Sequence, residues 1–232
     1  MSRISDINAL LNRADKLLPK MESDYNNSLQ AKSISADLKI DIKDFVGHLR
    51  SALDYLAHDI RDKFCPTANQ NDDLYFPIRG DRTKFDNYIN RAFPGLNSNC
   101  SDLYNYLEEI QPYHGSNNVW LTHFNDLNNE NKHEKLVEQK RTETRTVKVS
   151  SNQSGGSVSW GPGVTFGSGI SIMGVPIDPR TQMPVPNNIT TTEVIIWVDF
   201  RFDSIDVSAL WLLKESLTKI KEIVTIVAQR VK

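Results

Sequence analysis

Three long segments share one spacing of apolar residues, and this spacing constrains the fold more than any other feature of the chain. Apolar side chains recur every three or four positions in residues 4–25, 42–64 and 210–231. Such a spacing places the side chains on one stripe of an α-helix, and long helices bury stripes of this kind against one another. The chain therefore predicts an antiparallel bundle of long helices.

Capping and stop signals suggest where these helices begin and end. The first helix is expected over residues 3–31. Ser33 or Ser35 can cap the second helix by accepting a hydrogen bond from a free backbone N–H. The second helix should end before Cys65, because the residue before a proline avoids the α-helical region. Shorter helices are expected over residues 82–92, 101–111 and 118–129.

The apolar period changes from helical to alternating after His133. Residues 141–150 alternate, residues 194–202 alternate strictly, and glycines and prolines mark turns between them. We expect a three- to four-stranded antiparallel β-meander, followed by a last helix that is capped by Ser204 or Asp206. The predicted fold class is α+β, as a single domain. Its parts are a helical part (1–135), a β-meander insertion (136–203) and a C-terminal helix (204–232) that returns to the bundle.

Charge and cysteine content narrow the classes of partner. The chain has 27 basic and 29 acidic residues, so nothing indicates DNA binding. Cys65 and Cys100 form no C-x-x-C pair and no disulfide framework, which is typical of a reducing compartment. No apolar run approaches the roughly 20 residues of a membrane-spanning helix, and no signal peptide is recognisable. We therefore expect a cytoplasmic protein with no membrane partner.

The second predicted helix carries a narrow polar arc. Arg50, Asp54 and His58 follow one another at intervals of four residues, so each can contact the next. One interpretation is a solvated helix face with an ordinary ion pair. The other is an Arg/His pair that handles phosphate, with Asp54 orienting His58, because arginine suits bidentate oxyanion contacts and histidine titrates near neutral pH.

A second polar cluster lies where helix gives way to strand. It consists of Asn128, Asn131, Lys132 and His133. These residues fit a helix C-cap with an exposed turn, or cationic and acid/base groups at the edge of a cleft. Tyr113 belongs to a set of tyrosines that either contact a ligand or lie at the boundary of the core. The histidines lack zinc-site spacing, so neither a metal nor a cofactor is expected.

Short sequence blocks occur in an order that resembles a group of uncharacterised bacterial proteins. The blocks are L-R-S-A-L-D at residues 49–54, F-P-I at 76–78, Q-P-Y at 111–113 and K-H at 132–133. The helical part also resembles a HEPN domain, a helical superfamily of bacterial defence and toxin systems. That resemblance implies nucleotide or RNA binding, and for many members a metal-independent ribonuclease that works as a homodimer.

We expect a HEPN-like nucleotide- or RNA-binding module, in bacterial or phage defence or counter-defence. The first alternative is a metal-independent ribonuclease, with His58 or His133 as acid/base group and Arg50 or Lys132 stabilising phosphate charge. Binding is preferred to cleavage because seven residues separate Arg50 from His58, a wider gap than in the HEPN motif. The second alternative is an oligomeric interaction protein without a small-molecule site, which would use the stripes of its first and last helices.

Overall fold

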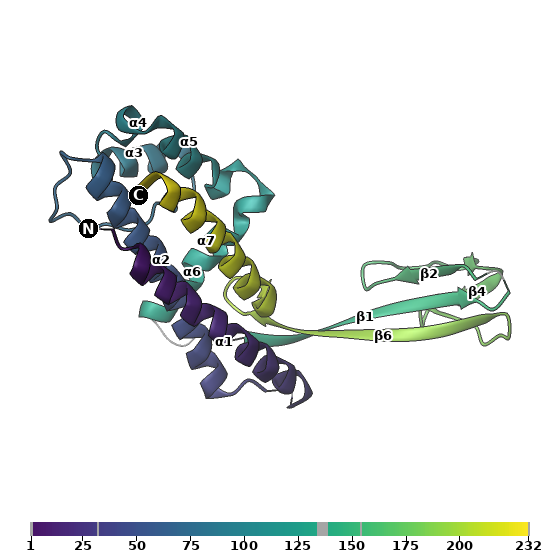
Figure 1. Cartoon of the computed structure of the whole chain (residues 1–232). Helices are drawn as coiled ribbons and strands as arrows, with labels where there is room; N and C mark the ends of the chain where they lie inside the picture. Colours follow the sequence, from purple (N-terminus) through teal and green to yellow (C-terminus); the bar gives the residue numbers. More distant parts are fainter. Residues whose placement is uncertain (1, 32, 134–138, 154, 232) are drawn as a thin grey trace. The chain divides into compact units, whose positions relative to one another are not determined.

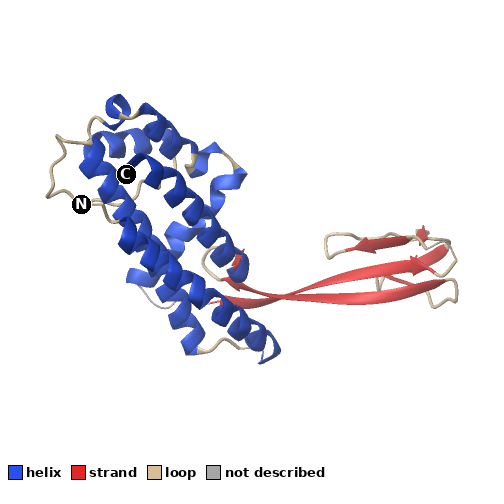
Figure 2. Ribbon diagram, viewed as in Figure 1, coloured by secondary structure: helices blue, strands red, loops and turns tan. Residues whose placement is uncertain are grey.

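The computed structural model describes residues 2–31, 33–133, 139–153 and 155–231, except the side chains of residues 30, 131–133 and 197. The chain forms two compact units. Unit 1 comprises Met1–Lys140 and Phe200–Lys232, and unit 2 comprises Arg141–Asp199. Helices fill unit 1, whereas unit 2 contains strands and loops (Figure 2). The mixture of helices and antiparallel sheets confirms the predicted α+β class.

Seven helices build the described part of unit 1 (Figure 1). Three are long and carry the apolar stripes that the sequence indicates. Ser35 caps the second of these helices by accepting a hydrogen bond from Leu38 N. Short 3₁₀ turns at Pro112–His114 and Ser116–Asn118 precede the sixth helix. The helices are α1 (Ile4–Ala31), α2 (Ala36–Phe64), α3 (Arg82–Ala92), α4 (Leu96–Asn99), α5 (Ser101–Glu109), α6 (Val119–His133) and α7 (Ala209–Val231).

The helices α1 and α2 form an antiparallel pair. Arg3, just before α1, pairs with Asp59 near the end of α2 at 2.9 Å, and Lys20 pairs with Asp41 near the start of α2. The last helix runs antiparallel to α1 as well. Its Lys214 pairs with Glu22 at 2.8 Å, whereas Lys221, two turns later, pairs with Asp15 at 2.5 Å.

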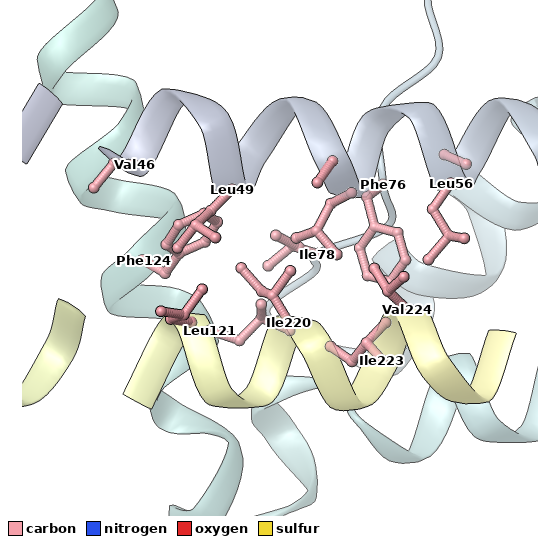
Figure 3. Packing of buried hydrophobic residues seen from close by; sticks show 14 of the residues in the cluster. Val46, Leu49, Leu56, Phe76, Ile78, Leu121, Phe124, Ile220, Ile223 and Val224 are labelled. Carbon is pink, nitrogen blue, oxygen red and sulfur yellow. The ribbon is translucent and has the colours of Figure 1, made fainter. Parts of the chain in front are cut away.

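The apolar stripes of these helices meet in one core. Leu49 of α2, Phe124 of α6 and Ile220 of α7 are fully buried and point toward one another (Figure 3). Phe76, from the extended segment after α2, places its buried ring near Leu56 of α2 and Val224 of α7. Burying a side chain of this size stabilises the fold by roughly 1.5–3 kcal/mol relative to leaving it exposed. Because the stripes of α1 and α7 are buried within the chain, they are not free to form an oligomer interface.

The strands form two small sheets. Four strands follow the order β2-β1-β6-β7, and three shorter strands follow the order β3-β4-β5. The pairs β1–β2, β3–β4, β4–β5 and β6–β7 are antiparallel. The strands are β1 (Gln139–Ser151), β2 (Ser157–Trp160), β3 (Ser171–Ile172), β4 (Val175–Asp178), β5 (Met183–Pro184), β6 (Thr190–Phe202) and β7 (Val207–Ser208).

This strand order differs from a meander, in which consecutive strands are neighbours. The proline-containing segment between β2 and β6 turns on itself at Met173 and Gly174, both with positive φ, and forms the second sheet. As a result β6 lies beside β1. A small cluster of four buried residues supports unit 2, namely Val147, Val149, Trp160 and Ile177.

The last helix begins later than the sequence suggests. Residues 203–206 form a turn, and Asp206 has φ 48°, a left-handed conformation that a right-handed helix cannot include. The chain then pairs back along β6 as β7, and α7 starts at Ala209. The expected caps Ser204 and Asp206 are therefore wrong. None of the described helices is both long enough and apolar enough to cross a membrane.

Candidate functional site

The extended segment at residues 75–79 is anchored on two sides by buried polar groups. On one side, Asp54 of α2 accepts a hydrogen bond from Phe76 N at 2.9 Å. On the other side, the buried Gln111 accepts from Arg79 N at 2.9 Å and donates to the carbonyl oxygens of Pro77 and Leu107. The three sequence blocks that include Asp54, Phe76 and Gln111 thus contact one another in the fold.

Two tyrosines flank this segment. The Tyr88 hydroxyl accepts a hydrogen bond from Tyr75 N at 2.9 Å and donates one to Tyr75 O at 2.8 Å. Tyr88 is buried, whereas 48% of Tyr75 is exposed. These two hydrogen bonds from the Tyr88 hydroxyl hold the backbone of Tyr75 in place, while the Tyr75 side chain stays accessible to solvent.

Three arginines converge on these tyrosines from three parts of unit 1. The guanidinium carbon of Arg79 lies 3.7 Å from the centre of the Tyr88 ring, and that of Arg91 lies 5.5 Å from it. The guanidinium carbon of Arg50 lies 5.8 Å from the centre of the Tyr75 ring. Cations at such distances are attracted by the ring electrons. We call these three arginines and two tyrosines the arginine–tyrosine cluster.

The cluster carries more positive charge than its surroundings neutralise. Arg50 Nε pairs with Asp54 Oδ2 at 3.1 Å, whereas no carboxylate of the described residues pairs with Arg79 or Arg91. The guanidinium of Arg79 instead donates to Ile78 O at 2.7 Å. Burial lowers the pKa of Arg79, and the positive charges of Arg50 and Arg91 lower it further. An anion placed here would relieve this repulsion.

Of the predicted site residues, Arg50 and Asp54 lie in or beside this cluster. Arg50 is only 7% exposed, so the solvated-face interpretation of the polar arc is wrong for this residue. Its Nη1 also donates to Asn125 Oδ1 on α6 at 3.3 Å. Asn128, one turn further along α6, is buried as well.

In the described structure Asp54 acts on His58 through its charge and does not orient it by a hydrogen bond. The two oxygens of Asp54 accept from Phe76 N and Arg50 Nε, and no hydrogen bond joins Asp54 to His58 in the described structure. Burial lowers the pKa of His58, and the charges of Arg3 and Arg61 add to this. Residues 131–133 are the last of α6, but the side chains of Asn131, Lys132 and His133 lie outside the described residues.

Tyr113 belongs to a different polar network around Glu108. The Tyr113 hydroxyl donates to Glu108 Oε1 at 3.0 Å, His114 Nε2 lies 2.5 Å from the same oxygen, and Arg82 Nη1 lies 2.9 Å from it. Burial alone would raise the pKa of Glu108, but these hydrogen bonds and the Arg82 charge lower it. Among the described residues no contact joins this network to Arg50, so the structure does not bring Tyr113 together with the predicted phosphate site.

A pocket of about 500 Å³ lies between α5, the 3₁₀ turns, α6 and α7. Its lining mixes aromatic and charged side chains, among them Tyr106, Glu109, His114, Trp120 and Glu222. Burial, together with the charge of Glu222, raises the pKa of Tyr106 to about 12. No group of three or more potential metal ligands gathers here or elsewhere among the described residues.

Sequence reasoning missed four members of the cluster. Tyr88 and Arg91 stand three positions apart on α3, which puts them on one helix face, and this is the only sequence signal for the pair. Tyr75 and Arg79 flank the F-P-I block, but their convergence on α3 depends on the tertiary fold.

Comparison with known proteins adds no function, because no protein family, no curated protein and no solved structure matches the chain.

Proposed function

We propose that the protein is a nucleotide- or RNA-binding module in which the arginine–tyrosine cluster holds phosphate. The observation that carries this proposal is the convergence of Arg50, Arg79 and Arg91 on two tyrosines beside one carboxylate. In keeping with the HEPN resemblance of the helical part, we place the module in bacterial or phage defence or counter-defence.

The residue chemistry supports phosphate as the bound group. A guanidinium presents several N–H donors in one plane and matches phosphate oxygens in a bidentate manner. Arg91 is exposed and has no carboxylate partner in the described structure, so its donors are available to a ligand. The exposed ring of Tyr75 offers a face on which a base can stack. Phosphate contacts from the arginines and stacking on Tyr75 together fit a nucleotide better than an isolated anion.

A thermal-shift screen with the whole chain tests this proposal. The ligands are inorganic pyrophosphate, mono-, di- and cyclic nucleotides and short RNAs. We expect at least one phosphate-bearing ligand to raise the melting temperature of the wild-type protein and of Arg180→Gln. This control removes an arginine of unit 2 whose side chain is 91% exposed. Arg91→Gln should reduce the shift strongly, and a shift of wild-type size in Arg91→Gln would refute the proposal.

One observation favours the ribonuclease alternative. Burial lowers the pKa of His58, which favours the neutral ring, the state that a general base requires. His58 lies two turns beyond Arg50 on α2. Cleavage that persists in EDTA and disappears in both His58→Ala and Arg50→Lys would support this alternative. Cleavage that is unchanged in His58→Ala and His133→Ala would exclude it.

A further inference from the structure

The strand β6 has a long backbone edge that no other strand covers. Figure 1 shows β1 beside β6 along one edge. On the other edge, β7 pairs only with Arg201 and Phe202. Between Thr191 and Val198 no strand of the described chain pairs with this outer edge. Its N–H and C=O groups therefore offer a template for another strand.

This edge also lacks the features by which sheet edges usually avoid pairing. Proteins protect such edges with proline, lysine, bulges or very short strands. Residues 191–199 contain neither proline nor lysine, and their only charged side chains are Glu193 and Asp199. The opposite edge of the sheet differs, because β2 is only four residues long.

Apolar side chains on β6 remain exposed. Val194 is 41% exposed and Ile196 is 58% exposed, the highest fraction among the large apolar residues of the described chain. Because they stand two positions apart on a strand, both project from the same face. The buried cluster of unit 2 contains four residues, and neither Val194 nor Ile196 belongs to it. A strand added to this edge would place its own side chains directly beside both of these.

We propose that β6 pairs antiparallel with β6 of a second copy of this chain, across a two-fold axis perpendicular to the sheet. Such an axis keeps each side chain on the same face of the sheet in both copies. The strands can therefore pair only in registers that place one residue of β6 on the axis, opposite its own copy. With the axis at Ile195, Val194 faces Ile196 of the second copy. With the axis at Ile196, Glu193 would face Asp199, and like charges directly opposite each other destabilise a sheet. The register centred on Ile195 is therefore preferred.

This proposal is independent of phosphate binding, since it concerns unit 2 alone. It also differs from an interface built on α1 and α7, whose apolar stripes are buried in unit 1. The occupant of the edge is a second copy because the strand is self-complementary in this register. Apolar side chains face each other at its centre, and the acidic residues stay apart.

Cross-linking and light scattering of the full chain test the proposal. In a Cys100→Ser background, which leaves only the buried Cys65, Ile195→Cys should form a disulfide-linked dimer under mild oxidation. The matched control Ile170→Cys alters another exposed aliphatic residue of unit 2, 42% exposed, and should remain monomeric. By light scattering, the apparent mass should rise above 26.4 kDa as concentration increases. Ile196→Lys should raise the dissociation constant more than about tenfold, because it buries a charge without a partner.

Two results would overturn the proposal. One is a monomeric mass at every concentration together with no disulfide cross-link at residue 195. The partner of the β6 edge would then not be a second copy of this chain. The other is a dimer that Ile196→Lys and Ile170→Lys affect equally, because the contact would then lie elsewhere. Both lysine substitutions are at exposed positions, so neither result would follow from misfolding.

Discussion

Replacing Asp54 with alanine should destabilise the protein far more than replacing an exposed aspartate. Asp54 is the carboxylate partner of Arg50, whose side chain is 8% exposed, and it also accepts the Phe76 amide. Removing one partner of a buried ion pair costs about 3–5 kcal/mol. Leaving the Phe76 N–H without an acceptor adds about 1 kcal/mol or more. Because Asp54 itself is 18% exposed, solvent offsets part of this cost, and we expect a total of about 3–4 kcal/mol, at or slightly below the sum of the two lower limits.

Urea unfolding followed by helical circular dichroism measures this loss. In a chain of this length, about 3–4 kcal/mol corresponds to a melting temperature lower by roughly 10 °C. The matched control is Asp24→Ala, which breaks a pair with Lys20 on α1 whose side chains are 57% and 36% exposed. This control should change stability by about 1 kcal/mol or less. The double variant Arg50→Met, Asp54→Leu should recover part of the loss, because no buried charge remains.

The result that would refute the reasoning is an Asp54→Ala variant as stable as the Asp24→Ala control. Asp54 would then not neutralise a buried Arg50, and the extended segment at residues 75–79 would not depend on it. A loss of the expected size that the double variant fails to recover would assign the effect to the Phe76 hydrogen bond alone. That outcome would weaken the electrostatic account of Arg50.

Three further predictions follow from buried groups of unit 1. Gln111→Leu should cost about 3 kcal/mol in urea unfolding, because it leaves three backbone groups without their partners; a loss below 1 kcal/mol would contradict this role. The pKa of His58 in the folded protein is lowered by burial and nearby positive charge. As pH falls, the unfolded chain therefore takes up this proton at a higher pH than the folded chain does. Stability should therefore fall as pH drops from 7 through the unfolded pKa of about 6.5, and His58→Gln should reduce that fall. Burial raises the pKa of Cys65 to about 11, so a thiol reagent should modify Cys100 in the native protein and Cys65 only after unfolding.

The helices could be predicted from the sequence because their stripes and caps are local signals. The α2 helix begins after the Ser35 cap and ends at Phe64, before the Cys65–Pro66 step, as its sequence indicates. The sheet order could not be predicted in the same way. An alternating period identifies a strand but does not name its neighbour, and β6 pairs with β1 across a long stretch of chain. The start of α7 depends on the left-handed backbone at Asp206, which no apolar pattern records.

The candidate site shows the same division between local and tertiary information. Helical spacing places Arg50 and Asp54 one turn apart, and the structure joins them by an ion pair. The spacing cannot tell whether this arc faces solvent, because that depends on what packs over it. Here Asn125 of α6 and the extended segment with Phe76 contact the arc and bury Arg50. Helical spacing puts Arg91 on the same face of α3 as Tyr88, but Arg79 and Arg91 join the site only through the fold.

A calorimetric titration of the full chain with the ligand that gives the largest thermal shift tests the central claim most directly. Wild-type protein and Arg180→Gln should bind with the same affinity, and binding should weaken as salt rises, because phosphate contacts are electrostatic. The double variant Arg79→Gln, Arg91→Gln should bind about a hundredfold more weakly or worse, since each charged hydrogen bond contributes about 1.5–3 kcal/mol. Equal affinity in the double variant and the control would contradict the account.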